Sequence, residues 1–329
     1  MNASLNPRGR TEATLGSTGL RVSRVGLGLA ALGRPAYIDT DRDRDLGADR
    51  SVEAMERRAH TVMDAAYEGG VRYFDAARSY GHAERFLASW LESHEVRVTV
   101  GSKWGYRYTA EWRLDAEVHE IKDHSIGALR RQYTGSREIL GAHLALYQIH
   151  SATLESGVLE DAGVLRELAR LRGDGVAIGL STSGPHQAEV IRRALVVSID
   201  GVNPFSAVQA TWNLLEPSVG PALAEAHDAG WGVIVKEAMA NGRLTSQVPV
   251  ALAEIGDARG VTPDRVAIAA VLTEPWVDVC LSGAVTEQQI RSNAAALEIS
   301  LAEEELQPLR RLAEPSESYW RTRSKLAWQ

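Results

Sequence analysis

Four side chains that can bind or move a proton occur in order along the first half of the chain. Asp75 and Tyr80 lie five residues apart in YFDAARSYGHAERFL, Lys103 follows the apolar run VRVTVGS, and His150 follows LALYQI. A phenol has an ordinary pKa of about 10, and a neighbouring cation favours its ionised form. We therefore expect Lys103 to lower the pKa of Tyr80, so that the phenol exchanges a proton near neutral pH. His150 could orient a carbonyl group or relay that proton.

The same residues also have purely structural interpretations. Asp75 and Lys103 could form a buried ion pair without a chemical role, because a buried lysine needs a partner. Tyr80 could simply pack its ring on the body of the protein. A single histidine such as His150, taken alone, is more often a core residue whose hydrogen bonds are made within the protein. The occurrence of all four residues in this order favours a catalytic role over a purely structural one.

The elements that position these side chains alternate between helical and strand periodicity from Ser51 onwards. Helix-like segments cover residues 51–69, 82–94, 120–133, 158–173, 186–196, 217–229, 249–259 and 263–273. Short apolar runs lie at residues 71–74, 96–102, 144–149, 176–180, 207–211, 232–235 and 277–281, and a run at 25–28 makes eight. Repeated βα units with strands that are apolar on both faces predict a parallel sheet.

The number of strands indicates a closed α/β structure, the (β/α)8 TIM barrel. A doubly wound sheet usually carries G-x-G-x-x-G after its first strand, but Ala31 occupies the place of the third glycine in GLGLAALG. We predict one domain over residues 1–329, with a polar leader (1–14) and a short hairpin around Ser-Thr-Gly. The tail at 314–329 either packs on the body or covers the barrel mouth.

Chemistry in such barrels is found at the carboxyl ends of the strands. The polar residues at these positions should therefore meet at one mouth: Asp75, Lys103, His150, Ser181, Thr182, Gln209, Lys236 and Glu237. Trp104 follows Lys103 directly, and we expect it to contact the substrate.

Composition points to a small-molecule partner. The net charge of −7 and the pI near 5.8 give no reason to expect nucleic acid or an anionic membrane as a partner. Cys280 is the only cysteine, which rules out an intrachain disulfide and a cysteine-based metal site and fits a reducing cytoplasm. The histidines show no metalloprotease spacing, and we expect no bound metal. No segment has the apolar length of a signal peptide or a membrane span.

Three segments together resemble the signature of the aldo-keto reductases, which are NAD(P)H-dependent oxidoreductases with a (β/α)8 barrel: FDAARSYGHAE, VGSKW and LYQIH. The resemblance continues through IGLSTS, VQATWNLLEP, VIVKEAMANGRLT and VCLSGAVTEQQIRSNAAAL, and it covers about residues 15–300. It implies that Asp75, Tyr80, Lys103 and His150 form a catalytic tetrad with Tyr80 as the general acid in reduction.

The resemblance also implies a nicotinamide cofactor, NADP(H) or NAD(H). The residues it assigns to the carboxamide are Ser181, Thr182 and Gln209, with Lys236 where many members place a tyrosine that stacks on the nicotinamide. Near the adenosine half it places Gly283, Gln289 and Asn293. Gly283, Ala284 and Val285 fill positions where members often carry Lys, Arg or Ser for the 2′-phosphate, and Arg291 is a candidate to replace them.

Three functions remain open from the sequence. The first is reversible reduction of an aldehyde or ketone, with the corresponding alcohol as the substrate in reverse. The second is a nucleotide-sensing regulatory subunit with little turnover, and the third is a Schiff-base lyase that uses Lys103 or Lys236. The loops at residues 34–50, 104–119 and 151–157 and the tail should decide the substrate, which the sequence does not identify. It leaves the oligomeric state open too.

Overall fold

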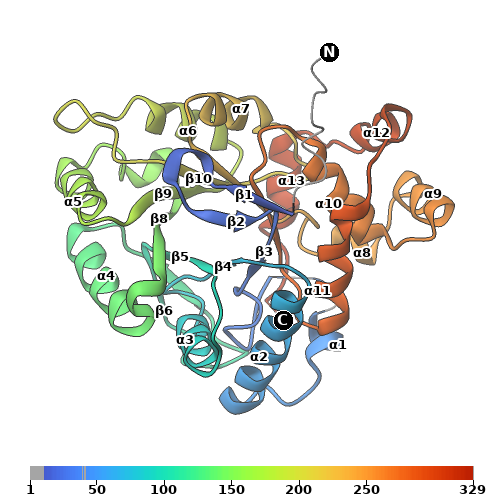
Figure 1. Ribbon diagram of the computed structural model, residues 1–329, viewed down its shortest axis with the longest axis horizontal. Helices are drawn as coiled ribbons and strands as arrows, with labels where there is room; N and C mark the ends of the chain where they lie inside the picture. The colour runs from blue at the N-terminus through green and yellow to red at the C-terminus, as the bar shows by residue number, and fades with distance from the viewer. Residues whose placement is uncertain (1–10, 39, 41, 329) are drawn as a thin grey trace.

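Eight parallel strands close into a barrel at the centre of the computed structural model, which describes residues 11–38, 40 and 42–328 (Figure 1). In barrel order they are β3 (Val25–Gly28), β4 (Tyr73–Asp75), β5 (Thr99–Trp104), β8 (Leu144–Ala152), β9 (Ala177–Thr182), β10 (Ala207–Thr211), β11 (Gly232–Lys236) and β12 (Val279–Ser282). β12 pairs with β3, Cys280 opposite Val25, which closes the ring. The predicted (β/α)8 barrel is confirmed.

The strands are buried on both faces, which explains their apolar sequences. On β11, Val233 and Val235 pack with the side chains of the surrounding helices, whereas Ile234 belongs to a separate cluster with Leu146 and Val279 of other strands. Successive strand residues point to opposite sides of a sheet. One set of side chains therefore fills the barrel interior, and the other set packs against the surrounding helices.

The helices surround the barrel (Figure 1). The longer ones are α2 (Val52–Glu68), α3 (Ala83–Ser93), α4 (Ile126–Leu140), α5 (Ala162–Gly173), α6 (Gln187–Leu195), α7 (Gly220–Asp228), α9 (Val250–Arg259) and α10 (Pro263–Thr273). Shorter ones are α1 (Arg42–Leu46), α8 (Arg243–Ser246), α11 (Glu287–Ala294), α12 (Glu303–Arg310) and α13 (Ser316–Arg323). Single 3-10 turns are η2 (Gly16–Thr18), η3 (Gly141–His143), η4 (Leu154–Ser156) and η5 (Ala295–Glu298).

One predicted helix needs correction. The sequence predicts a helix over residues 120–133, but α4 begins at Ile126, because the Ser125 side chain caps it by accepting a hydrogen bond from Ala128 N over 3.2 Å. The preceding residues instead form β7 (Glu120–Lys122), which pairs with β6 (Tyr106–Tyr108) as an antiparallel hairpin.

The predicted N-terminal hairpin is present and lies across one end of the barrel. β1 (Glu12–Thr14) pairs with β2 (Arg21–Ser23), starting earlier than the apolar run suggests. Leu15 fills the barrel end and approaches Gly232 so closely that a Cβ there would lie 2.4 Å from Leu15 Cγ. Residues 1–10 of the predicted leader lie outside the described part of the chain.

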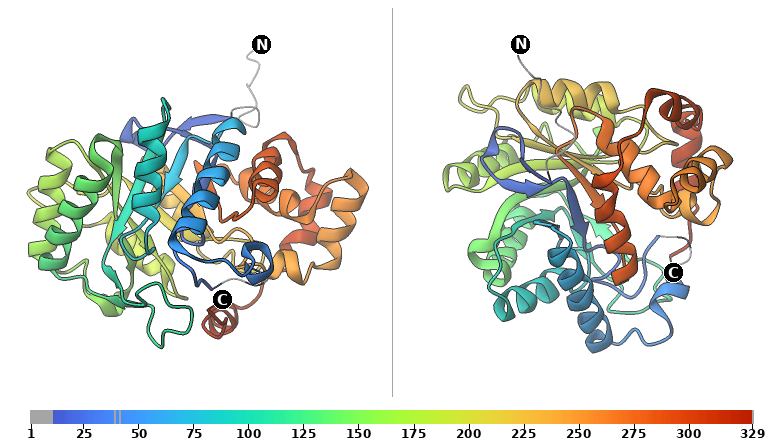
Figure 2. Two further views of the ribbon diagram at one scale, coloured as in Figure 1. Left: turned by 90° about the horizontal axis from the view of Figure 1, so that it is seen from below. Right: turned by 45° about the vertical axis from the view of Figure 1, so that its right-hand side comes forward.

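The tail lies at the other end of the barrel. The left panel of Figure 2 shows the hairpin at the upper edge of the molecule and the carboxyl-terminal segment at the lower edge. No helix within the described ranges combines the length and the apolarity that crossing a membrane requires.

Candidate active site

A cavity of about 630 Å³ opens at the carboxyl ends of the strands. Its lining includes Asp75, Tyr80 and His150 at the barrel mouth, and it continues past β12 to Gln289 and Asn293 on α11. Sites for organic cofactors are typically concave and of about 300–1,000 Å³. The cavity therefore connects the predicted tetrad with the residues that were assigned to the adenosine half of a dinucleotide.

Asp75 and Lys103 form an ion pair beneath the cavity. Lys103 Nζ donates to Asp75 Oδ1 and to Ala76 O, the latter over 3.0 Å, and Lys103 is only 1% exposed. Asp75 Oδ2 also accepts hydrogen bonds from Gln148 Nε2 over 3.3 Å and Gln209 Nε2 over 3.0 Å. Burial lowers the pKa of Lys103, and the attraction of Asp75 opposes this shift. The pair is thus a desolvated but well-partnered charge centre.

Tyr80 lies above this pair and faces His150. Its hydroxyl is 3.4 Å from His150 Nε2, and Lys103 Nζ lies 5.0 Å from the centroid of the Tyr80 ring. The Lys103 ammonium therefore lies beside the ring, with its hydrogen bonds directed to Asp75 and Ala76.

The expected lowering of the Tyr80 pKa is wrong for this structure. Burial raises the pKa of Tyr80 well above its ordinary value and the Asp75 carboxylate raises it further, while the Arg34 guanidinium opposes the shift. Desolvation outweighs the attraction of this guanidinium, so the phenol stays protonated near neutral pH. A protonated phenol is the form that can donate a proton to a substrate.

His150 is held as a neutral imidazole. Burial lowers the pKa of His150 well below its ordinary value, and the positive charges of Lys103 and Arg34 lower it further. The ring lies within reach of two hydroxyls, with Ser79 Oγ 3.4 Å from Nδ1 and Tyr80 Oη 3.4 Å from Nε2. A neutral histidine with one N–H can donate one hydrogen bond into the cavity and accept another.

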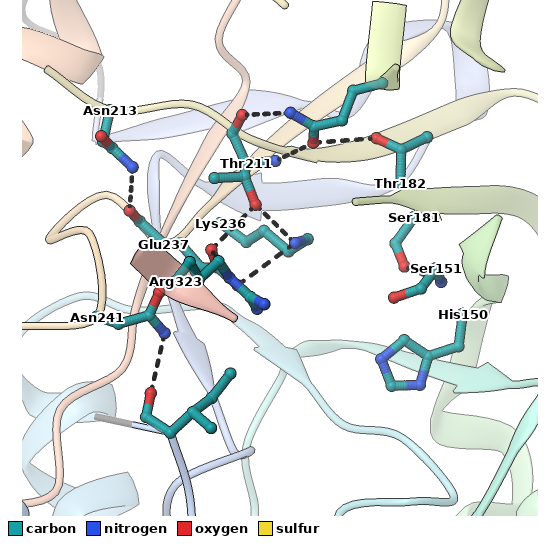
Figure 3. Close-up of polar contacts among 12 residues, drawn as sticks. His150, Ser151, Ser181, Thr182, Thr211, Asn213, Lys236, Glu237, Asn241 and Arg323 are labelled. Atoms are coloured by element: carbon teal, nitrogen blue, oxygen red, sulfur yellow. Dashed lines mark hydrogen bonds and ion pairs between the residues drawn. The ribbon is translucent and has the colours of Figure 1, made fainter. Parts of the chain in front are cut away.

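Lys236, Glu237 and Arg323 form a second charged group across the cavity from His150 (Figure 3). Lys236 Nζ donates to Thr211 Oγ1 over 2.7 Å and lies 3.6 Å from Glu237 Oε1, while Arg323 Nε donates to Glu237 Oε2 over 2.8 Å. Burial lowers the pKa of Lys236 to about 8. Burial alone would raise the pKa of Glu237, but the guanidinium of Arg323 and the ammonium of Lys236 hold it at about 2.

The carboxyl-terminal tail both packs on the body and covers the mouth, so the two alternatives for it hold together. Tyr319 is fully buried and accepts a hydrogen bond from Asn213 Nδ2 over 3.0 Å. Beyond Arg323, the chain reaches Trp328, which lines the cavity and stacks on His119 with ring centroids 4.2 Å apart.

Arg34 is a lining residue that the sequence did not single out. Its guanidinium lies 4.9 Å from the Tyr37 ring, 5.1 Å from the Tyr80 ring and 4.8 Å from the Trp328 ring. Arg34 Nη1 donates to Glu120 Oε2 over 2.9 Å. Arg34, Tyr37 and Trp328 come from a loop and the tail that were expected to decide the substrate, but no periodicity indicates which of their side chains turn inward.

Among the three residues assigned to a carboxamide, only Gln209 lines the cavity within the described ranges. Ser181 Oγ accepts a hydrogen bond from Ser151 N over 2.9 Å, and Thr182 Oγ1 donates to Gln187 Oε1 over 3.3 Å. Both side chains are buried at the end of β9, beside the lining residue Ser183.

Gly283, Gln289 and Asn293 all line the far part of the cavity. Gln289 Oε1 accepts from Val285 N over 2.9 Å, and Asn293 lies beside Ser282 Oγ at 2.8 Å. The structure thus brings Asp75, Tyr80 and His150, with Lys103 buried beneath them, to the same continuous cavity as these three residues.

The prediction that Trp104 contacts the substrate is corrected. Trp104 is 0% exposed, packs in the outer hydrophobic cluster with its ring 5.7 Å from His124, and is absent from the cavity lining of the described chain. Lys103 points into the barrel, so its neighbour on the strand must point outward. Tyr106, two residues further on, lines the cavity instead, with its ring centroid 5.0 Å from that of His150.

The residues present fit a nicotinamide dinucleotide. Asn241 Oδ1 and Arg34 Nε are buried polar atoms of cavity-lining residues and have no hydrogen-bond partner among the described residues. Such atoms are costly unless a ligand or water pairs with them. No group of three or more His, Cys, Asp or Glu side chains in the described ranges is arranged to hold a metal ion.

Comparison with known proteins gives consistent matches. The model of the Aldo/keto reductase family matches residues 25–314. An uncharacterized oxidoreductase of Bacillus subtilis (strain 168), YrpG, is 27% identical over 90% of this chain and 93% of its own. The NADH-specific methylglyoxal reductase of Escherichia coli (strain K12) is 25% identical over 92% of this chain and 98% of its own. The structure of an aldo-keto reductase from Klebsiella pneumoniae in complex with NADPH superposes with a TM-score of 0.67 at 18% identity, covering 94% of this chain and 98% of that one.

Proposed function

Because the chain belongs to the aldo/keto reductase family, whose members reduce carbonyl compounds with NAD(P)H, we propose that Tyr80 is the general acid of a reversible carbonyl reduction. The observation that carries this proposal is the Tyr80 hydroxyl, 3.4 Å from His150 Nε2 in the cavity, with the Lys103–Asp75 pair behind its ring.

Tyr80 and His150 act together on the substrate in this proposal. A carbonyl oxygen that lies between Tyr80 Oη and His150 Nε2 accepts a hydrogen bond from each, which stabilises the negative charge that develops on it. Tyr80 then transfers its proton to that oxygen. The Lys103 ammonium, fixed by Asp75, stabilises the phenolate that is left, and the proton returns in the reverse reaction.

The nicotinamide cofactor supplies the hydride when it is bound. We propose that Ser181, Thr182, Gln209 and Lys236 surround the nicotinamide end and that Gly283, Gln289 and Asn293 lie along the adenosine end. Gln209 Nε2 is already bonded to Asp75, so Gln209 would offer its amide oxygen to a carboxamide. The whole chain, residues 1–329, is proposed to act as one domain.

Turnover with a panel of carbonyl compounds tests this function. The purified protein is mixed with NADH or NADPH and with small aldehydes, ketones and aldoses, and the absorbance of the reduced nicotinamide is followed. We expect consumption of reduced cofactor that depends on the carbonyl compound. Tight nucleotide binding without turnover on the whole panel would instead favour a nucleotide-sensing subunit, and absence of nucleotide binding would contradict the proposal.

Lys236 should make the binding of oxidised cofactor depend on pH. The oxidised nicotinamide ring is positively charged, so the Lys236 ammonium repels it below the lysine pKa of about 8, and the neutral amine does not. His150 stays neutral and Tyr80 stays protonated across this range. Between pH of about 7 and about 9, the affinity for oxidised cofactor should rise by about tenfold, with little change for reduced cofactor.

Fluorescence titration with both redox forms at the two pH values measures this effect. Lys236→Met keeps the length of the side chain and removes its charge. This variant should therefore bind oxidised cofactor equally well at both pH values. The same pH dependence in Lys236→Met would assign the titration to another group.

A further inference from the structure

Two carboxylates, Asp45 and Asp264, line the part of the cavity next to α11, where a cofactor phosphate would lie. We propose that Asp45 makes this enzyme selective for NAD(H) over NADP(H). The inference rests on the proposed function, because it takes the nicotinamide to lie at Tyr80 and the adenosine to lie at the α11 part of the same cavity.

Asp45 reaches this part of the cavity from the loop that follows β3. It lies on α1 and lines the cavity, and its Oδ2 accepts a hydrogen bond from Gln289 Nε2 over 2.6 Å. Gln289 is itself fixed, because its Oε1 accepts from Val285 N over 2.9 Å and Thr286 N over 3.3 Å. The carboxylate of Asp45 is therefore held at a defined place beside the first turn of α11.

A second carboxylate lines the same part of the cavity. Asp264 lies beside Asn293, and in the amide orientation that satisfies both groups, Asn293 Nδ2 donates to Asp264 Oδ2 over 2.7 Å and to Gln289 O over 3.2 Å. Val285 also lines the cavity, and it contributes only an apolar side chain.

Two arginines, Arg42 and Arg44, also line the cavity at this end, and each already interacts with other groups of the protein. Arg42 is buried and directs its guanidinium to backbone carbonyls, including Pro35 O over 2.8 Å. Arg44 Nε lies 3.6 Å from Asp45 Oδ1, so its charge accompanies that carboxylate. Arg291, the residue expected to compensate for missing phosphate ligands, pairs with Glu68 over 2.7 Å and is not part of the lining in the described chain.

These charges distinguish the two cofactors. The ribose 2′-hydroxyl of NAD(H) is a donor, and an acidic side chain that accepts from it is a recognised means of selecting NAD. The 2′-phosphate of NADP(H) is a dianion that would lie against Asp45 and Asp264 in a partly desolvated site, where like charges repel strongly. A phosphate would normally require a basic side chain in this position.

Calorimetric titration of the full-length protein with NAD⁺ and NADP⁺ tests the inference. We expect the wild-type protein to bind NAD⁺ at least about tenfold more tightly than NADP⁺, the effect of one unfavourable charge contact. Asp45→Asn should reduce that ratio by about tenfold, mainly through tighter NADP⁺ binding, because asparagine can still accept the hydrogen bond from Gln289. Val285→Arg should also tighten NADP⁺ binding by adding a cation to the lining.

The matched control is Glu287→Gln, which removes one negative charge from the first turn of the same helix. The Glu287 side chain is about half exposed, lies 3.9 Å from Arg291, and is not among the cavity-lining residues of the described chain. The nucleotide ratio should be unchanged in this variant. An equal shift in Glu287→Gln and Asp45→Asn would show that net charge, and not Asp45, sets the ratio.

The outcomes separate this inference from the proposed function. Equal or tighter binding of NADP⁺ by the wild-type protein overturns the selectivity and leaves the reductase intact, whereas binding of neither nucleotide overturns the reductase itself. If Asp45→Asn does not fold, Val285→Arg carries the test alone, and unchanged NADP⁺ affinity in that variant contradicts the placement of the phosphate.

Discussion

Replacement of Tyr80 by Phe should lower kcat by roughly 10²- to 10⁴-fold, the contribution expected of a positioned general acid. The ring of Phe still fills the space beside Lys103, so only the hydroxyl that faces His150 is lost. Affinity for the nicotinamide cofactor, measured by fluorescence titration, should stay within a factor of about two of the wild-type value. Steady-state assays with the best carbonyl compound give kcat.

Tyr106→Phe is the matched control, because Tyr106 is the other phenol close to His150 and lines the same cavity. Burial raises the pKa of Tyr106 to about 12, so it too is protonated near neutral pH. We expect this variant to alter KM more than kcat. If Tyr106→Phe lost turnover and Tyr80→Phe kept it, the acid would be Tyr106 and the assignment of Tyr80 would be wrong.

Lys103→Met should lower the free energy of unfolding by about 3–5 kcal/mol, as removal of one partner from a buried ion pair does. The side chain of Lys103 is 0% exposed and that of Asp75 is 2% exposed, so the variant leaves an uncompensated carboxylate in the barrel interior. Denaturant unfolding measures the loss. Turnover should fall as well, because Tyr80 loses the cation that stabilises its phenolate.

The double variant Lys103→Met with Asp75→Asn separates stability from chemistry. Removal of both charges should recover most of the lost stability, since no unpaired charge remains, while turnover stays low. Recovery of turnover together with stability would show that the pair has only a structural role. Unchanged stability in the single variant would show that the carboxylate is not desolvated.

The barrel was predictable because its elements are regular. Alternation of amphipathic helices with strands that are apolar on both faces, as in residues 232–235 and 207–211, leaves few other folds. The strand ends also give the order of Asp75, Lys103 and His150 around the mouth. The antiparallel pairing of β6 with β7 was missed, because polar strands of three residues carry no such pattern.

The pKa of Tyr80 was mispredicted because the sequence gives proximity but not burial. Lys103 is indeed near, but its ammonium is directed to Asp75, and desolvation of the phenol is the larger effect. Trp104 shows a different error, since the alternation of side chains along β5 already implied that it could not share the direction of Lys103.

The rest of the site depends on long-range contacts that no local pattern reveals. Asp45 meets Gln289 and Arg323 meets Glu237, although the partners are far apart in sequence. The contacts of loops and tails depend on the packing of the whole chain. A single sequence therefore identifies the loops that border the site, but not which of their side chains point into it.

The placement of residues 323–328 over the mouth has a practical consequence for handling the protein. An affinity tag, fusion partner or linker attached directly after Trp328 would begin beside the cavity that Trp328 lines, and we expect it to obstruct access to that cavity. The β1–β2 hairpin lies at the opposite end of the barrel (Figure 2). Attachments placed ahead of that hairpin would leave the mouth of the cavity open on a sensor chip or an immobilisation resin.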